Sequence, residues 1–138
     1  MDDSIRLVDY FYIDAADRPG EAARILERLR DARVDLLGFS GFPQGRRAQL
    51  DFMPADAAAF RAIARKERWK LTGPKKGFLV QGTDRVGAVA EILGKLGASG
   101  VNVTATDAVC AGAGRFGMLL WVKPRDVKRA AKALGVGG

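Results

Sequence analysis

The chain has 138 residues, the length of one ordinary domain or of two very small ones, which excludes large enzyme architectures. Hydrophobic residues make up 48% of it and charged residues 28%, as in an average globular protein, and no run approaches the roughly 18 apolar residues that a membrane-spanning helix needs. The acidic N-terminus is unlike a secretory signal, so we expect a soluble, cytoplasmic protein.

Composition also excludes most familiar catalytic chemistry. Histidine is absent and Cys110 is the only cysteine, which excludes Ser-His-Asp and Cys-His catalysis, zinc sites built from cysteine and histidine, and an internal disulfide. No D-x-D motif or glutamate pair marks a magnesium or acid/base site. We therefore expect no enzymatic activity, no cofactor and no metal, and we interpret Cys110 as a small apolar strand residue.

The net charge of +7 is unevenly distributed along the chain. Residues 1–67 hold 11 basic and 12 acidic side chains, a net charge of −1, whereas residues 68–138 hold 12 and 4, a net charge of +8. A strongly basic half is typical of proteins with an anionic partner, so RNA stays open as an alternative partner.

An internal repeat determines the predicted architecture. The run at residues 17–20, Asp-Arg-Pro-Gly, returns 67 residues later as Asp-Arg-Val-Gly at residues 84–87. The same shift aligns apolar positions of the two halves: Phe11 with Phe78, Ala23 with Ala90, Ile25-Leu26 with Ile92-Leu93, Leu29 with Leu96, and Val34 with Val101. Because one ungapped register holds for both the turn and the apolar face, the sequence predicts two copies of one unit.

The first copy predicts the element order β-α-β-β-α-β. A strand over 7–14 leads into a helix opened by Pro19-Gly20, with Pro19 at the first helical position. The remaining expected elements are strands at 34–42 and 47–53 around a turn at 43–45, a helix at 55–66 with Phe60, Ile63 and Ala64 inward, and a short strand at 69–71.

The second copy repeats this order with a strand at 78–81, a helix, a hairpin over 101–122 and a last helix. Its final strand would begin at Val136 and is missing or vestigial, which leaves an edge to be covered by another segment or subunit. We predict an α+β protein of two ferredoxin-like βαββαβ units in tandem, 1–73 and 74–138, with residues 73–77 as the linker. Each antiparallel sheet would carry its helices on one face.

Both faces of several strands are apolar, as in residues 118–122, so we expect both sheet faces to be covered. Units of this size would be only marginally stable alone, which favours pairing of the copies and further association as a homodimer.

The second copy carries a family resemblance. A strand leads into residues 84–87, a helix follows, and Gly100-Val101-Asn102-Val103 comes at the helix exit. This pattern resembles the ACT domain, a ferredoxin-like regulatory module that senses amino acids. The first copy has the same turn motif but places Asp35 where Asn102 stands. Together the copies cover nearly the whole chain, which is similar to a free-standing tandem ACT protein.

The resemblance implies a small ligand, such as an amino acid, bound between the loop after one module's first strand and the second strand of a neighbouring module. The physics of a helix start supports such a site, because it presents unpaired backbone N–H groups and a glycine lets a carboxylate approach. The candidate residues are Asp84, Arg85, Val86, Gly87, Ala88, Val89 and Asn102 in the favoured site, and Asp17, Arg18, Pro19, Gly20 and Asp35 in the other.

The two sites need not be equivalent. Asn102 offers both a donor and an acceptor to a ligand, whereas an ionised Asp35 accepts from an ammonium group and repels a carboxylate. The simpler interpretation of the loops is that Asp17 and Asp84 cap their helices and that the glycines only make the turns.

Other features of the sequence have more than one interpretation. Residues 112–117 match G-x-G-x-x-G, but a strand is predicted after them where a dinucleotide site needs a helix, so they indicate a hairpin tip. RNA-recognition domains share the β-α-β-β-α-β order, yet Phe116 shares its face with Met118 and Leu120, which favours core packing.

The basic residues of the last helix lie mostly opposite its apolar stripe, which is typical of a solvated face: Lys123, Arg125, Lys128, Arg129 and Lys132. A protein-interaction module with no ligand is the remaining alternative.

Overall fold

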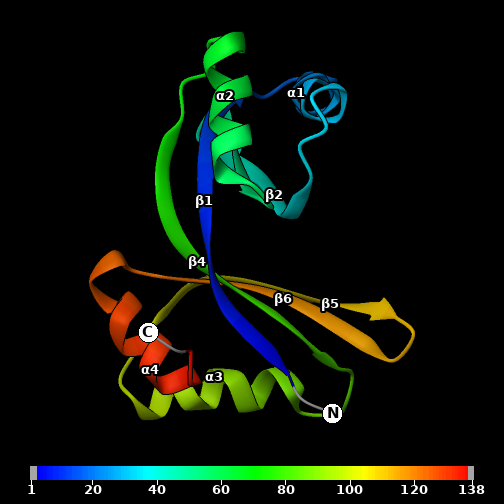
Figure 1. Ribbon diagram of the computed structural model, residues 1–138. Helices are drawn as coiled ribbons and strands as arrows, with labels where there is room; N and C mark the ends of the chain where they lie inside the picture. The colour runs from blue at the N-terminus through cyan, green and yellow to red at the C-terminus, as the bar shows by residue number, and fades with distance from the viewer. Residues whose placement is uncertain (1–2, 137–138) are drawn as a thin grey trace. The chain divides into compact units, whose positions relative to one another are not determined.

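The computed structural model describes residues 3–136 and divides into two compact units (Figure 1). The first unit is Asp9–Lys75, and the second unit joins the chain up to Val8 to the chain from Lys76 onward. Two strands, β1 (Ser4–Ala16) and β4 (Thr72–Thr83), each contribute residues to both units. Each unit is an α+β, ferredoxin-like arrangement with its helices on one face of the sheet, as the sequence predicts.

The first unit adds four elements to its parts of β1 and β4: α1 (Glu21–Asp31), β2 (Leu36–Gln44), β3 (Arg47–Pro54) and α2 (Ala57–Glu67). Its strand order is β2-β3-β1-β4, and β1 and β2 both pair antiparallel with β3. The fully buried rings of Phe11 and Phe52 lie 5.1 and 5.4 Å from the ring of Phe60 on α2, which packs the helix onto the sheet.

The second unit contains α3 (Ala88–Ala98), β5 (Val103–Gly112), β6 (Arg115–Val122) and α4 (Val127–Leu134), which follows a single 3-10 turn at Pro124–Asp126. The strand order is β1-β4-β6-β5, and β6 pairs antiparallel with β4 and with β5. Buried residues of α3 and α4 pack on alternate residues of β4 and β6. They include Ile92, Leu96, Leu134, Phe78, Val80, Phe116, Met118 and Leu120.

The N-terminal segment takes the place of the strand that the second copy lacks. Ile5 and Leu7 pack against the core of the second unit, while Arg6 between them is exposed. This alternation is that of a strand with one face on the core. Val136, where the last strand was expected to begin, is not in a strand, and residues 137–138 lie outside the described residues.

The structure differs from the predicted division of the chain at residues 73–77. These residues lie inside β4 and are not a linker, because β4 continues through the Gly-Pro pair. Gly73 has φ +125, and an added Cβ would lie 2.8 Å from the carbonyl oxygen of Tyr10, so the close approach of the two strands requires glycine. The second difference is that residues up to Val8 cluster with the second unit, where the sequence placed them in the first.

The helix starts also differ in detail from the prediction. Pro19 was expected at the first helical position, but it lies in the turn, Gly20 is the N-cap and the helix begins at Glu21. By contrast α2 begins as expected for a capped helix, because the carboxylate of Asp56 accepts from the backbone N–H groups of Ala58 and Ala59 at 3.0 and 3.2 Å.

Candidate functional site

The loops that open α1 and α3 have the same backbone geometry. Gly20 has φ 83 and ψ −9, and Gly87 has φ 86 and ψ 5, the left-handed conformation that glycine adopts without strain. An ideal Cβ at either position would meet no atom within 4 Å. The space beside both glycines is therefore open, so another molecule can approach the backbone there.

Neither helix start is capped by a side chain. The capping role considered for Asp17 and Asp84 is therefore not the one the structure shows. The carboxylate of Asp84 instead accepts a hydrogen bond from the thiol of Cys110 on β5 at 3.2 Å. The N–H groups of Glu21 and Ala88, the first residues of the two helices, donate to the carbonyl oxygens of Arg18 and Arg85 at 3.3 Å, and no N-cap side chain accepts from the N–H groups that follow.

A cavity of about 250 Å³ lies against the start of α3, within the second unit. Five of the predicted residues line it: Asp84, Arg85, Gly87, Ala88 and Val89. The other lining residues are Ala90 on the helix, Phe116 on β6, and Ala108, Val109 and Cys110 on the edge strand β5. Its only carboxylate is that of Asp84, and most of its wall is aliphatic or aromatic.

Two exposed apolar side chains belong to the same region. Val86, at the tip of the loop, is fully exposed, and Val109 is 69% exposed. Large apolar side chains left open beside a cavity are typical of a binding surface. Sequence reasoning had selected Val86 but missed the lining residues of β5 and β6, because these strands reach the loop only through their antiparallel pairing; the missed residues of the two strands are Ala108, Val109, Cys110 and Phe116.

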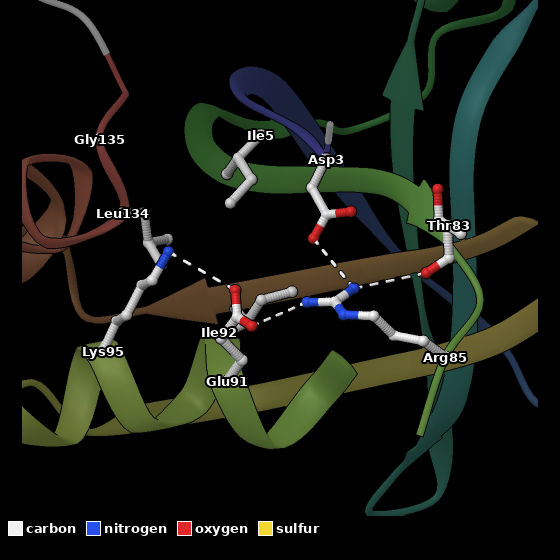
Figure 2. A pocket seen from close by; sticks show the side chains of 9 residues that line it. All are labelled: Asp3, Ile5, Thr83, Arg85, Glu91, Ile92, Lys95, Leu134 and Gly135. Carbon is white, nitrogen blue, oxygen red and sulfur yellow. Dashed lines mark hydrogen bonds and ion pairs between the residues drawn. The ribbon is translucent and has the colours of Figure 1, made fainter. Parts of the chain in front are cut away.

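Arg85 also lines a second cavity, in whose wall Figure 2 shows its guanidinium among charged neighbours. Its guanidinium donates to Oε1 of Glu91 at 2.9 Å and to the carbonyl oxygen of Thr83 at 3.4 Å, and it lies 3.5 Å from Oδ2 of Asp3. The hydrogen bond to Glu91 raises the pKa of Arg85, and the same contact lowers the pKa of Glu91. The positive charge of Arg85 is therefore balanced by the carboxylates of Asp3 and Glu91.

The second cavity, of about 600 Å³, is bounded by these charged residues and by Ile5, Ile92, Lys95, Leu134 and Gly135. Lys95 lies 3.9 Å from Glu91, so acidic and basic groups alternate along one wall. The first unit lacks this arrangement at Arg18, the arginine of its own Asp-Arg-Pro-Gly turn. The side chain of Arg18 is 71% exposed and makes one long contact of 3.9 Å to Glu21, whose carboxylate is bound more closely by Arg24 at 2.9 Å.

Asn102 and Asp35 do not join the helix-opening loops of their own units. Both are exposed and lie just before β5 and β2, outside the strands in which they were expected. Each follows the end of the helix whose start carries the glycine, and an 11-residue helix is about 16 Å long. The carboxylate of Asp35 accepts from the backbone N–H of Leu36 at 3.0 Å, a local turn contact.

Cys110 faces a carboxylate, which disfavours the thiolate form through which a cysteine reacts. The hydrogen bond to Asp84 and the negative charge of that residue raise the pKa of the Cys110 thiol, because both disfavour the thiolate. The thiol is exposed. The interpretation of Cys110 as a non-nucleophilic strand residue therefore has a physical cause that the sequence did not show.

A buried carboxylate that the sequence analysis did not single out lies in the first unit. Asp51 on β3 is 5% exposed, and its Oδ1 accepts from the side-chain amide of Gln49 at 3.0 Å. Burial raises the pKa of Asp51, against the opposing effects of Gln49 and Lys75. Burial and the nearby Asp51 also raise the pKa of Tyr10. The available signal was an acidic residue inside the apolar strand predicted at 47–53.

The charge asymmetry that favoured RNA disappears when charges are counted by structural unit. Residues 9–75 carry 13 basic and 10 acidic side chains, a net charge of +3, and the rest of the chain carries 10 and 6, a net charge of +4. Phe116 is buried in the core, as predicted, and is not presented on an open sheet face. The basic residues of the last helix segment are exposed, as in a solvated helix face.

Within residues 3–136, no group of three or more histidine, cysteine, aspartate or glutamate side chains is placed to hold a metal ion. In the same stretch, no helix has both the length and the apolar composition needed to cross a bilayer.

Known proteins resemble this chain in fold. No known protein family and no curated protein sequence matches it. Among solved structures, protein BT0572 from Bacteroides thetaiotaomicron is 14% identical, with a TM-score of 0.81 over 94% of this chain and 87% of that one. The regulatory subunit of aspartate kinase from Thermus thermophilus is 14% identical, with a TM-score of 0.64 over 96% and 94%.

One of the similar structures is a whole enzyme, and this chain matches only part of it. Aspartokinase III of E. coli, crystallised with aspartate and ADP, is 13% identical to this chain, with a TM-score of 0.53. The alignment covers 96% of this chain but only 32% of the enzyme. At these identities the comparisons show the fold, and that fold is the one found in regulatory subunits of aspartate kinase.

Proposed function

We propose that this chain is a non-catalytic, tandem ACT-type regulatory module that binds a small neutral amino acid at the start of α3. The observation that carries the proposal is a mostly apolar cavity of about 250 Å³ whose lining includes both Asp84 and Gly87, the glycine at a helix start that no side chain caps. An α-amino acid has the complementary charges, a carboxylate and an ammonium group, on neighbouring atoms.

The fold supports a regulatory role. The similar structures include a regulatory subunit of aspartate kinase, and in a whole aspartokinase the matching part is about a third of the chain. Folds host many functions, so this support is an analogy, and the argument for a ligand comes from the site.

The polar groups of the cavity define how a ligand would lie. Its carboxylate would accept from backbone N–H groups of the first turn of α3 that follow Ala88, whose own N–H donates to the carbonyl oxygen of Arg85 at 3.3 Å; the helix dipole favours negative charge there and Gly87 presents no side chain. Its ammonium group would lie at Asp84, competing with the thiol of Cys110 for the same carboxylate. Arg85 would stay with its protein partners, since its guanidinium is directed into the other cavity.

The apolar wall selects the side chain of the ligand. Ala88, Val89, Ala108, Val109 and Phe116 offer no charged or hydrogen-bonding group to the end of a side chain. Burying a charge without a partner costs several kcal/mol, so lysine and aspartate would bind more weakly than valine, isoleucine or leucine. We therefore infer a compact aliphatic amino acid as the ligand.

Some residues that the resemblance names do not line this cavity, and we infer that they serve a neighbouring module. Asn102 lies beyond the far end of α3, so it would reach a ligand only at the loop of another module. The edge strand β5 is exposed from Thr104 to Gly112 and contains neither lysine nor proline, the residues that usually keep edges from pairing. We propose that a second copy of the chain packs here and completes the site as a homodimer.

Regulation would follow by linkage. A ligand held between two modules binds the associated state better than the separate modules, and so shifts the population toward it by its differential affinity. A target protein that distinguishes these states would then respond to the amino acid concentration.

Thermal unfolding tests the proposal directly. L-Valine, L-isoleucine or L-leucine at millimolar concentration should raise the midpoint of the wild-type chain, and lysine and aspartate should raise it less. Protection of Cys110 from alkylation by the same amino acids would place them in the cavity. If no amino acid raises the midpoint, the sensor function is wrong. Tight RNA binding that weakens steeply with salt would favour the nucleic-acid alternative instead.

A further inference from the structure

The loop that opens α3 is tied to the N-terminal segment by an ion-pair network. Figure 2 shows the guanidinium of Arg85 between the carboxylates of Asp3 and Glu91, with a third contact to the carbonyl oxygen of Thr83. Asp3 directly precedes β1 and Glu91 lies in the first turn of α3, so one side chain of the loop joins three segments of the second unit. The side chains of Asp3 and Arg85 are 17% and 37% exposed, which leaves the pair partly shielded from water.

Gly82 makes room for Asp3. An ideal Cβ at Gly82 would overlap the carboxyl group of Asp3, lying 2.7 Å from its Cγ, and would also lie 2.8 Å from a ring carbon of Phe116. Gly82 is in β4 with an ordinary strand conformation, so no turn requires a glycine there. What the position requires is space for both the Asp3 carboxylate and the ring of Phe116.

The first unit lacks the network at the corresponding positions. The 67-residue shift places Ala15 at the position of Gly82, Arg24 at that of Glu91 and Arg18 at that of Arg85. Arg18 makes one long contact to Glu21 and is mostly exposed. The network is therefore a property of the second unit, which also holds the cavity at the start of α3.

We propose that Arg85 and Asp3 are positioning residues that couple docking of the N-terminal segment, residues 3–8, to the conformation of the ligand loop, residues 84–87. This inference rests on the proposed function for its ligand, and it concerns the regulation of that same site. Arg85 is one residue from Asp84 and two from Gly87, so a change in its partners moves the two groups assigned to the ammonium and the carboxylate of the ligand. By reciprocity, ligand binding strengthens docking of residues 3–8 as much as docking strengthens ligand binding.

The coupling is expected to be modest because the network is partly exposed. Single ion pairs at protein surfaces contribute about 0.2–1 kcal/mol, which corresponds to changes of up to about 5-fold in an equilibrium constant. We therefore expect each conservative substitution in the network to act within about 2- to 5-fold on both docking and ligand affinity.

Hydrogen exchange of the backbone amides of residues 4–8 measures docking, because these amides exchange through local opening. Arg85→Gln and Asp3→Asn should each speed their exchange about 2- to 5-fold, and the double variant should do no more than either single change. Arg18→Gln, at the corresponding position of the first unit, is the matched control and should leave residues 4–8 unchanged. Gly82→Ala should also speed exchange, through its overlap with both Asp3 and the ring of Phe116, whereas Gly117→Ala, whose added Cβ would come no closer than 4.0 Å to the carbonyl oxygen of Val80, should not.

Ligand binding supplies the second readout. L-Valine or L-isoleucine should slow exchange at residues 4–8 in the wild type, and Asp3→Asn should weaken binding of the same amino acid about 2- to 5-fold and abolish that protection. A purely structural role for the pair would speed exchange but leave the amino acid affinity unchanged.

The outcomes separate the two proposals. Unchanged exchange in both Arg85→Gln and Asp3→Asn would overturn the docking role of the pair. Faster exchange with unchanged amino acid affinity would overturn the coupling and leave the proposed function standing. If the wild type binds none of the amino acids, the proposed function fails and the ligand linkage fails with it, while the exchange experiment still decides the docking role.

Discussion

The thiol of Cys110 donates a hydrogen bond to the carboxylate of Asp84 at 3.2 Å, joining the edge strand β5 to the loop that opens α3. The two residues are 26 positions apart in the chain, and the pairing of β5 with β6 brings them together. Both residues line the candidate cavity, so the reactivity of the Cys110 thiol can be used to detect the carboxylate of Asp84 there.

The reactivity of Cys110 should therefore respond to Asp84. Asp84→Asn removes the charge that raises the pKa of the thiol, so the thiolate fraction at pH 8 and the rate of alkylation by iodoacetamide should both increase. The measurement is the alkylation rate against pH followed by mass spectrometry. Asp107→Asn, an exposed acid on the same strand, is the control and should leave the rate nearly unchanged. Equal rates in all three proteins would show that the contact does not persist in solution.

Gly87 and Gly20 provide a paired test of the candidate site. A β-branched residue with φ near +85 is strained, so Gly87→Val and Gly20→Val should each lower the free energy of unfolding by about 1–2 kcal/mol. Only Gly87→Val should also reduce binding of L-valine or L-isoleucine by at least 10-fold, because its side chain would block the start of α3. Chemical unfolding and calorimetric titration give the two quantities. Undiminished binding by a folded Gly87→Val protein would contradict the backbone site.

Asp51 should make stability depend on pH. Its pKa is raised in the folded state, so the folded protein holds this proton more tightly than the unfolded chain, whose aspartates have a pKa of about 3.9. Its stabilising contribution is complete below that pH and is lost as the pH rises through the folded-state pKa. Asp51→Asn keeps an oxygen that can accept from Gln49 and removes the charge, so the variant should be more stable than the wild type at pH 7.

The check for Asp51 is the difference in unfolding free energy between variant and wild type, measured from pH 3 to pH 8. It should grow with pH and vanish at the acidic end. Asp56→Asn, at the N-cap of α2, serves as the comparison, because asparagine also caps helices well. A difference for Asp51→Asn that does not depend on pH would mean that the carboxylate is not desolvated.

The N-terminal segment should contribute to the stability of the second unit. Leu7→Ala removes a half-buried side chain from the core of that unit and should cost about 1–2 kcal/mol, below the range of about 2–5 kcal/mol for fully buried leucines. Arg6→Ala, one position away on the exposed side of the strand, should cost less than about 0.5 kcal/mol. Hydrogen exchange in β4 and β6 would report the loss. Equal effects of the two substitutions would contradict the packing of this segment.

The sequence predicted the repeated unit correctly because the repeat recurs in apolar positions. Ile25, Leu29, Ile92 and Leu96 all proved buried, as a helix face packed on a sheet requires. The hairpin predicted at residues 112–117 is present, but its tip is only residues 113–114, because Gly112 ends β5 and residues 115–117 already belong to β6. These features depend on residues close together in the chain, where periodicity and turn chemistry act directly.

The candidate site was only partly predictable. The glycine turns could be identified because a left-handed backbone at a helix start has a sequence signature in glycine. The partners of Arg85 could not, because Asp3 lies 82 positions away and reaches it only once β1 has been placed in the sheet. The proposed pairing of Asn102 with a loop depends on a neighbouring module, and it stays a prediction.

The sequence by itself determined that this chain folds as two similar α+β units with glycine turns at the first helix of each. It could do so because helix and strand periods and turn chemistry are local. Only the tertiary structure decided that residues 3–8 complete the second unit and that residues 73–77 are strand. A strand finds its partner by backbone hydrogen bonds and shared apolar burial, and neither depends on distance along the chain.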